Sequence, residues 1–183
     1  MSQADTTQNG GDTFRARAST TTVVGPEQTW ALVGDLARSP EWSPECTGGE
    51  WVSGGPGTVG SVFRGENHRD TEVVAWAPVV RGHWTTEMEV VEAERLRTMS
   101  WAMRTKDGRA QDSVWSFDLD LSENGGTVLT HRFRMGALTE GMQGIVADMT
   151  PAQEGDFYRE WGAKVESDLR TTVERIRGLL EKS

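Results

Sequence analysis

His131 places a titratable group on an apolar strand face. It alternates with Leu129, Phe133 and Met135, so the four side chains are predicted to share one face of a strand. Imidazole changes its charge near neutral pH, which suits it to accepting or donating a proton. A lone histidine on such a face is more often a hydrogen-bonded core residue than a catalyst. The catalytic interpretation therefore requires that this face border a cavity.

Two other places carry polar groups that could contribute to a site. His68 has the same strand parity as Arg64 and Glu66, and their face is either solvated or supplies polar contacts at one end of a cavity. His83 is predicted to face solvent. Tyr158, near the start of a C-terminal helix, could offer a hydroxyl at a cavity mouth.

The spacing patterns of common metal and cofactor sites are missing from the sequence. The three histidines show neither His-x-x-x-His nor His-Glu-x-x-His spacing. Cys46 is the only cysteine, which excludes a Cys-x-x-Cys metal site and an intramolecular disulfide. No nucleophile elbow, Walker loop or dinucleotide fingerprint occurs. We expect neither a metal nor a cofactor.

Length and charge limit the class of protein. The 183 residues fit one domain, and the formal charge of −9 repels phosphate backbones, so nucleic-acid binding is not expected. The polar N-terminus lacks a signal-peptide pattern, and no apolar run is long enough to cross a bilayer. We expect a cytoplasmic protein with no membrane anchor, a disordered tail over residues 1–12 and a single domain over residues 13–183.

The elements that must position these residues begin with a strand and a short helix. Residues 13–24 alternate and are rich in β-branched side chains, which predicts a strand. A Pro-Glu pair suits the first turn of a helix, and apolar spacing extends this helix over residues 26–37. The stretch SPEWSPE follows at residues 39–45, where two prolines hold Trp42 on a stiff corner.

The middle of the chain contains strands separated by glycine-rich breaks. Residues 50–53 and 59–70 are predicted strands with a Gly-Gly-Pro-Gly break between them. Residues 71–81 form either an irregular loop with an apolar lip or a strand interrupted at Pro78. An antiparallel meander of four strands follows, each with one apolar face. These strands are predicted over residues 83–90, 96–105, 111–121 and 127–135.

A long amphipathic helix is predicted from about Ala152 to the end of the chain. Together these elements predict an α+β protein with a six- to seven-stranded antiparallel sheet. A single helix is roughly 10 Å wide and cannot fill the concave side of such a sheet. The remaining space is either packed by large side chains or left as a cavity, and eight tryptophans fit both alternatives.

Several motifs occur in an order that resembles a known family. They are GPEQTWALVGDLARSPEWSPE, VGSVFRGEN, the W-x-T-x-x-x-V of residues 84–90, SVWSFDL and GGTVLTHRF, followed by the long terminal helix. In this order they resemble the START-related helix-grip (SRPBCC) superfamily and, more narrowly, its polyketide cyclase/dehydrase-like proteins. The resemblance covers roughly residues 13–181 and is more specific for fold than for function.

The resemblance implies a helix-grip fold. A curved antiparallel sheet would wrap around the C-terminal helix, with two short helices after the first strand and a ligand cavity between sheet and helix. Trp42 would project inward as a wall of this cavity, with His68 at one end. The inward faces of the strands and the helix would supply the other ligand-binding residues: Trp84, Met88, Met99, Trp101, Met103, Trp115, Phe117, Phe133, Met135, Trp161 and Val165.

The leading functional hypothesis is binding of a hydrophobic small molecule of polyketide, lipid or aromatic type. In a cyclase, the cavity would fold a polyketone for intramolecular aldol condensation and dehydration, and His131 with Tyr158 or Arg64 would handle protons or polarise a carbonyl. The alternatives are a non-catalytic carrier or sensor and a protein-interaction module with a filled core. An acyl carrier protein is a further candidate partner, and the chain is expected to be a monomer or a homodimer.

Overall fold

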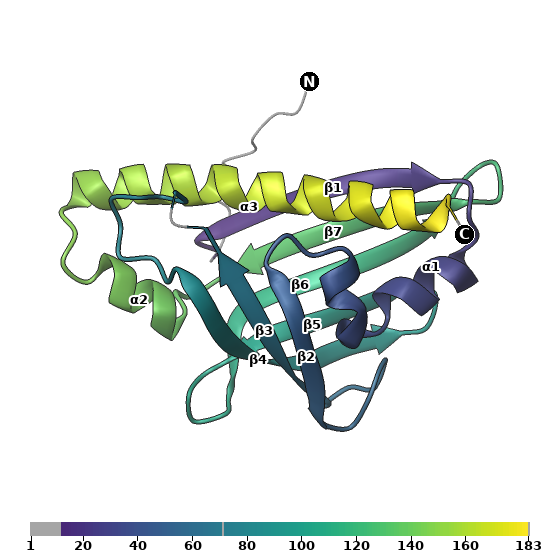
Figure 1. Ribbon diagram of the computed structural model, residues 1–183, viewed down its shortest axis with the longest axis horizontal. Helices are drawn as coiled ribbons and strands as arrows, with labels where there is room; N and C mark the ends of the chain where they lie inside the picture. The colour runs from purple at the N-terminus through teal and green to yellow at the C-terminus, as the bar shows by residue number, and fades with distance from the viewer. Residues whose placement is uncertain (1–11, 71, 183) are drawn as a thin grey trace.

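A seven-stranded antiparallel sheet curves around one long helix in the computed structural model, which describes residues 12–70 and 72–182 (Figure 1). The strands are β1 Phe14–Thr22, β2 Cys46–Ser53, β3 Val62–Arg69, β4 Gly82–Glu94, β5 Thr98–Arg104, β6 Ala110–Leu121 and β7 Thr127–Met135. Their order across the sheet is β1-β7-β6-β5-β4-β3-β2, so β1 and β2 form the two edges. The predicted helix-grip architecture is confirmed.

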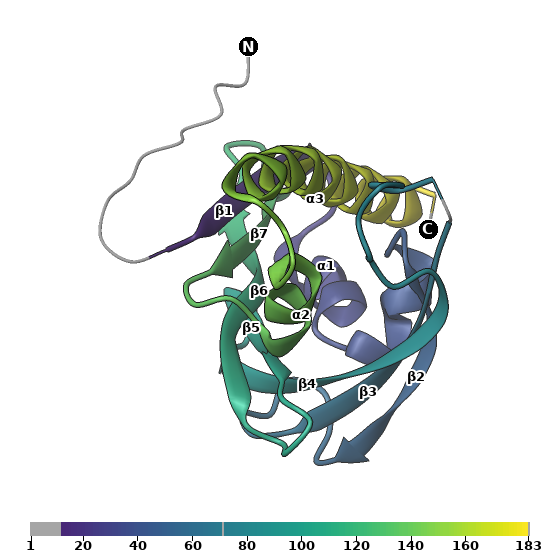
Figure 2. The same cartoon turned by 90° about the vertical axis from the view of Figure 1, so that its left-hand side faces the viewer.

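The helices cover the concave side of the sheet. They are α1 Pro26–Val33, the 3₁₀-helix η1 Leu36–Glu41, α2 Glu140–Val146 and α3 Pro151–Leu180. Figure 2 shows α3 lying along the top of the curved sheet, with α1 and α2 between them. In Figure 1, α1 and α2 lie at opposite ends of the molecule. The space enclosed by sheet and α3 therefore has a different short helix at each end.

Helix α3 is specified by its cap and its apolar stripe. The hydroxyl of Thr150 accepts from the backbone N–H of Gln153, and the Gln153 side chain accepts from the N–H of Thr150, a capping box. The buried positions from Gly162 to Leu180 recur mostly at three- and four-residue steps, and Phe157 lies five residues before Gly162. They are Phe157, Gly162, Val165, Leu169, Thr172, Val173, Ile176 and Leu180. This stripe is long enough to cover the sheet along β1.

The helix predicted over residues 26–37 is in fact two elements. Helix α1 ends at Val33, and Gly34 forms its C-terminal cap. Asp35 then starts η1, because its carboxylate accepts from the backbone N–H of Ala37 at 3.0 Å. The local hydrogen bond made by Asp35 interrupts the continuous helix that apolar spacing predicted.

The structure also corrects the predicted start of one strand and decides between the two alternatives for residues 71–81. Strand β2 begins at Cys46, earlier than the predicted start at residue 50. Residues 72–81 form turns and irregular backbone, and their apolar residues Val74, Ala77 and Val79 are buried. The alternative of a strand interrupted at Pro78 is wrong for the described part of this segment.

The predicted tail over residues 1–12 lies outside the described residues except for Asp12. The Asp12 carboxylate pairs with Arg15 and, at 3.1 Å, with Arg134 on β7. Across residues 12–70 and 72–182, no helix has both the length and the apolar character needed to cross a membrane.

Candidate functional site

The predicted site lies between the concave face of the sheet and α3, and its deeper part is closely packed. Seven of the thirteen predicted ligand-binding residues are buried here, and each of these seven is at most 6% exposed. These deep residues are Trp42, Met99, Trp101, Phe117, Phe133, Met135 and Val165. His131 lies among them and is 3% exposed. The structure therefore brings residues from η1, β5, β6, β7 and α3 into one layer.

A second group of inward-facing residues is only half-buried. Met88 lies opposite Met103 across β4 and β5, and Trp115 lies opposite Phe133 across β6 and β7. Cross-strand partners share a face of the sheet, so these side chains point to the same side as the deep layer. The half-buried group consists of Trp84, Met88, Met103, Trp115, Tyr158 and Trp161.

The half-buried group lies at one end of the sheet, where β4 and β6 begin and where β5 and β7 end. An inward-facing side chain retains accessible surface only where water-sized space reaches it. These side chains therefore remain partly accessible to water beside the N-terminal half of α3. Helix α2, which follows β7, lies at the same end of the molecule (Figure 1).

His131 is held as a neutral imidazole. Its Nδ1 lies 2.9 Å from the backbone oxygen of Ser116. Because a carbonyl oxygen can only accept, Nδ1 carries the proton and donates, which leaves a lone pair on Nε2. Burial lowers the pKa of His131 from 6.5 to about 4, and the hydrogen bond to Ser116 opposes this shift only in part. No described residue forms a hydrogen bond with Nε2.

Aromatic rings surround this imidazole. Phe117 stacks on His131 with ring centroids 4.2 Å apart, and Trp101 and Trp115 lie 6.0 and 5.7 Å from it. Trp42 meets Phe117 at a right angle, with centroids 5.2 Å apart. The indole Nε1 of Trp42 is buried and has no hydrogen-bond partner among the described residues. The deep layer thus contains one donor and one acceptor without partners.

The three predicted catalytic residues are not brought together. Arg64 lies on the outer face of the sheet and pairs with Glu87 at 3.0 Å. The hydroxyl of Tyr158 donates to Glu154, one turn earlier on α3, at 2.9 Å. Burial and Glu154 raise the pKa of Tyr158 to about 12. His131 is therefore the member of the predicted trio that contacts the deep layer.

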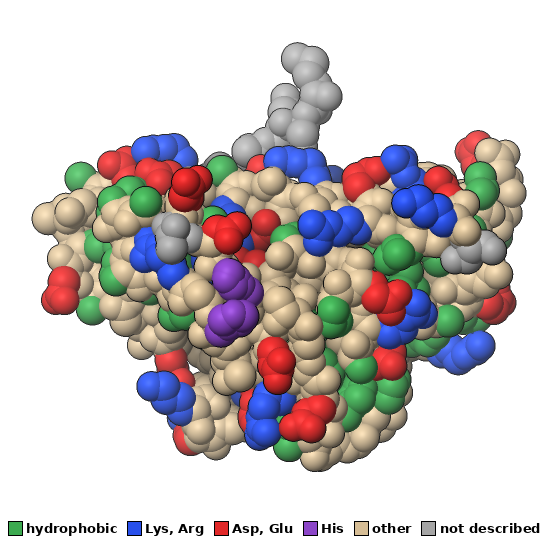
Figure 3. All heavy atoms as spheres, in the orientation of Figure 1, with side chains coloured by type: hydrophobic (Ala, Val, Ile, Leu, Met, Phe, Trp, Pro, Cys, Tyr) green, Lys and Arg blue, Asp and Glu red, His purple; other side chains and the backbone are tan. Residues whose placement is uncertain are grey.

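The expectation that Arg64 and His68 line the interior is corrected by the parity of β3. Phe63 is fully buried, so the alternate residues Arg64 and His68 face outward. The ring of His68 lies 4.5 Å from that of His83, its cross-strand partner. Figure 3 shows histidine side chains together on this surface. The solvated-face interpretation of His68 agrees with this placement.

Sequence reasoning missed an inward-facing ion pair at the end of β3. Arg69 is only 9% exposed in its side chain, and its Nε and Nη2 donate to the two carboxylate oxygens of Glu45 at 2.6 and 3.0 Å. The guanidinium lies over the rings of Trp84 at 4.5 Å and Trp161 at 5.2 Å. The sequence did carry a signal for the inward orientation of Arg69, since Arg69 has the same strand parity as Phe63.

Lys164 and Asp168 on α3 complete this cluster. The ammonium of Lys164 lies 2.7 Å from Glu45 and also pairs with Asp168. Burial alone would raise the pKa of Glu45, but the hydrogen bond from Arg69 and the charges of Lys164 and Arg69 hold it below its usual value. Burial raises the pKa of Asp168 more than Lys164 lowers it. The ion cluster, defined as Glu45, Arg69, Lys164 and Asp168, links the β2–β3 edge to α3.

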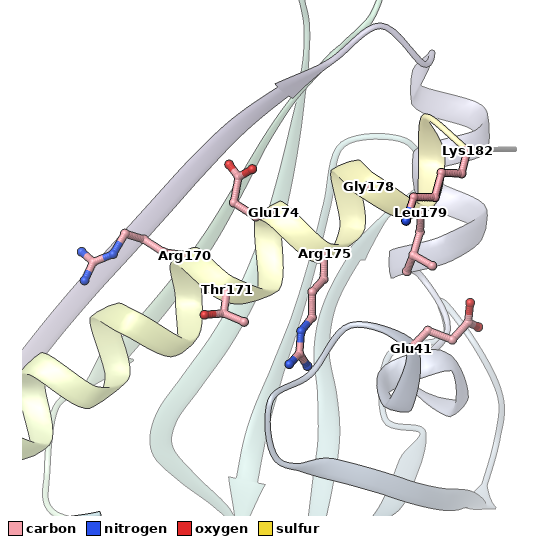
Figure 4. A pocket seen from close by; sticks show the side chains of 8 residues that line it. All are labelled: Glu41, Arg170, Thr171, Glu174, Arg175, Gly178, Leu179 and Lys182. Carbon is pink, nitrogen blue, oxygen red and sulfur yellow. The ribbon is translucent and has the colours of Figure 1, made fainter.

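A groove of about 730 Å³ lies elsewhere, between the C-terminal part of α3 and η1 (Figure 4). Its lining residues are Glu41, Arg170, Thr171, Glu174, Arg175, Gly178, Leu179 and Lys182. The carboxylates in it are paired with arginines: Glu41 with Arg38 at 2.6 Å and Glu174 with Arg177 at 2.5 Å. Five of its eight lining residues are charged, and it is separate from the aromatic interior.

Comparisons with known proteins agree with this architecture. Residues 13–180 match the model of the family described as polyketide cyclase / dehydrase and lipid transport. The chain is similar in structure to the Polyketide_cyc-like protein Cgl2372 from Corynebacterium glutamicum, with 24% sequence identity, a TM-score of 0.57 and 91% of each chain covered.

Two further solved structures share the fold. The Zhui aromatase/cyclase from Streptomyces sp. R1128 is 14% identical with a TM-score of 0.64, and 92% of this chain and 94% of that chain are covered. Protein MLL2253 from Mesorhizobium loti is 17% identical with a TM-score of 0.58, and 93% of this chain and 98% of that chain are covered. Comparison with curated protein sequences gave no match.

Proposed function

The chain belongs to the polyketide cyclase/dehydrase and lipid-transport family, and from this premise we propose that it binds a hydrophobic small molecule between the sheet and α3. The observation that carries the proposal is the half-buried inward group, above all Met88, Met103, Trp115 and Trp161. Methionine is among the residues most often buried completely, and tryptophan is highly buried on average. Here they retain accessible surface, which a bound apolar molecule would remove from water.

The chemistry of the interior supports an apolar ligand. The buried residues of the described chain include no Asp, Glu, Lys or Arg. Methionine and tryptophan form walls that adapt to bulky apolar molecules. Arg69 and Lys164 at the accessible end are already paired with Glu45, so a charged ligand would lose its hydration here without gaining an unpaired ionic partner.

Filling the accessible end of the interior tests the proposal. Met103→Trp is expected to weaken binding of the neutral apolar dye Nile red by about 5- to 150-fold, because overpacking by a larger side chain costs about 1–3 kcal/mol. Leu121→Trp, at a position that is 71% exposed on the same sheet, is the matched control and should leave the affinity unchanged. A fluorescence titration measures both. A wild-type protein that does not bind the dye, or an unchanged affinity in Met103→Trp, contradicts the proposal and leaves the interaction-module alternative.

Cyclisation is a second candidate function, supported by the free Nε2 of His131. An unprotonated ring nitrogen beside bound substrate could remove a proton from a carbon acid, although a group with a pKa of about 4 is a weak base. Most of the rate enhancement would then come from folding the chain of ketones into a reactive conformer. Partnership with an acyl carrier protein and a monomeric or homodimeric state remain predictions.

His131→Asn separates cyclase from carrier. The asparagine amide keeps a donor near the position of Nδ1 but removes the base at Nε2. For a cyclase, we expect conversion of a linear poly-β-ketone to a dehydrated ring, followed by mass spectrometry, to fall by about 100-fold or more, the usual contribution of a general base. Nile red binding should persist. Equal conversion in wild type and variant, beyond the rate without protein, would argue against a role for His131 as a base.

A further inference from the structure

Two histidines lie side by side on the outer face of the sheet. His68 on β3 is the direct cross-strand partner of His83 on β4, and their ring centroids are 4.5 Å apart with an angle of 63° between the rings. The whole connection between β3 and β4 separates them in the chain, so a search for metal motifs within one short segment does not detect this pair. The pairing of the two strands brings the imidazoles together on the surface (Figure 3).

The backbone hydrogen bonds of β3 place these two side chains at the closest spacing that an antiparallel pair allows. The N–H of His68 donates to the backbone oxygen of Glu45 at 2.9 Å, on the side of β3 that faces β2. His68 and His83 therefore form a non-hydrogen-bonded pair across β3 and β4, in which the Cα atoms are about 4.5 Å apart. Two imidazoles at this spacing can reach one ion between them.

Both rings are accessible, and the neighbouring polar side chains are directed elsewhere. His83 is exposed and His68 is half-buried, and neither imidazole forms a hydrogen bond or an ion pair with a residue that the structure describes. Glu66 precedes His68 on this face, but its carboxylate leans over β2, 3.1 Å from the position that a Cβ on Gly48 would occupy. The thiol of Cys46 donates to the backbone oxygen of Gly48 at 3.2 Å. The ligands offered at this place are thus two ring nitrogens.

This pair of ligands selects a class of metal ion. Imidazole suits Zn²⁺, Ni²⁺ and Cu²⁺, whereas Mg²⁺ and Ca²⁺ prefer several oxygen ligands. Within residues 12–70 and 72–182, no cluster of three or more His, Cys, Asp or Glu side chains could hold a metal ion, so solvent must fill the remaining positions around an ion bound here. Cu²⁺ binds a given set of ligands most strongly in the first-row divalent series, and it accepts a tetragonal arrangement of nitrogen and oxygen ligands.

We propose that His68 and His83 form a two-imidazole site for a divalent late transition-metal ion, with Cu²⁺ bound most tightly. Each ring supplies one nitrogen, and water or a small anion completes the coordination. The next residues along the strands, Arg69 and Trp84, point inward, where the guanidinium lies over the indole at 4.5 Å. A bound ion therefore links β3 to β4 on the outer side of the accessible end of the interior. Its binding does not require a ligand between the sheet and α3.

Copper titration of the full chain tests the site. Calorimetry with CuCl₂ at pH 7.5, with glycine present to remove loosely held copper, should show one ion per chain. The electron paramagnetic resonance spectrum of this 1:1 complex should show coupling to two imidazole nitrogens. Zn²⁺ should bind more weakly than Cu²⁺, and Mg²⁺ should not compete. A spectrum without coupling to two nitrogens would overturn the proposal.

Four variants assign the ligands. His68→Gln and His83→Gln each remove one ring nitrogen and should weaken Cu²⁺ binding by at least about 10-fold, since loss of even a residue that supports a metal ligand typically costs 10- to 100-fold. Glu66→Gln and Cys46→Ser are matched controls beside the pair and should leave the affinity unchanged. Both histidine substitutions change outward-facing side chains, so the variants are expected to fold. Copper binding that persists unchanged in either histidine variant, or that is lost in Cys46→Ser, would contradict the two-imidazole site and indicate adventitious binding elsewhere.

Discussion

Lowering the pH from 7 to 4 is expected to reduce the free energy of unfolding by about 3 kcal/mol through His131 alone. In the unfolded chain its imidazole takes up a proton near the ordinary pKa of 6.5, whereas burial lowers its pKa in the fold to about 4. Between these values the unfolded state binds the proton and the folded state does not. The contribution is fully present above pH 6.5 and is lost as the pH falls toward 4.

Urea unfolding of wild type and His131→Asn at pH 7, 5.5 and 4 measures this effect. The variant keeps a donor for the Ser116 carbonyl but cannot titrate, so its loss of stability over this range should be smaller than that of wild type by about 3 kcal/mol. His83→Asn changes an exposed histidine on the outer face and should leave the wild-type difference in place. The same pH dependence in wild type and His131→Asn would show that the imidazole is not buried as described.

Arg69→Met is expected to lower the free energy of unfolding by about 3 kcal/mol. The substitution keeps a flexible apolar stem but removes both hydrogen bonds to Glu45, a carboxylate that is only 23% exposed. Removing one partner of a buried ion pair typically costs about 3–5 kcal/mol, because the other charge stays desolvated. Residual pairing of Glu45 with Lys164 places the expected value at the lower end.

An exposed pair is the matched control for this prediction. Arg97 lies 3.2 Å from Glu94, and their side chains are 72% and 59% exposed. Arg97→Met should therefore change the free energy of unfolding by less than about 1 kcal/mol. Adding Glu45→Gln to Arg69→Met should cost less than the sum of the two single changes, since both remove the same interaction. Equal effects at Arg69 and Arg97 would contradict the buried placement of the ion cluster.

The ion cluster also connects stability to the proposed site. Arg69 lies over the rings of both Trp84 and Trp161, one on β4 and the other on α3. These rings belong to the half-buried group at the accessible end of the interior. Arg69 therefore holds two walls of the proposed site at a fixed separation, and Arg69→Met is expected to weaken Nile red binding as well.

Much of the fold could be predicted because the signals that define it are local. Alternation along residues 127–135 identified the buried face that carries Leu129, His131 and Phe133. This signal depends only on the strand's own sequence and not on the element that packs against it. The spacing of apolar residues from Phe157 to Leu180 likewise predicted one long helix with one buried stripe. The break of the helix at Gly34 and Asp35 was missed, because a single side-chain cap outweighed continuous apolar spacing.

The candidate site was predictable only in part. Parity selected the inward aromatic residues, and the structure places them together between the sheet and α3. Parity also places Arg64 and His68 on the outer face, away from the predicted site, since Phe63 on the same strand points inward. A strand's polar side chains can be assigned to a face only once one of its neighbours is known to be buried.

By itself, the sequence determined which side chains share a face along the four-stranded meander and along α3, because alternation and helical spacing depend on neighbours in the chain. Only the tertiary structure decided which of these faces meet. It joined Glu45, Arg69 and Lys164 from three separate segments and placed Trp42 and His131 against the ring of Phe117, with Nε1 of Trp42 unpaired. Burial and hydrogen-bond partners depend on contacts between distant segments, so the pKa of His131 and the unpaired N–H of Trp42 emerge only when the sheet closes around α3.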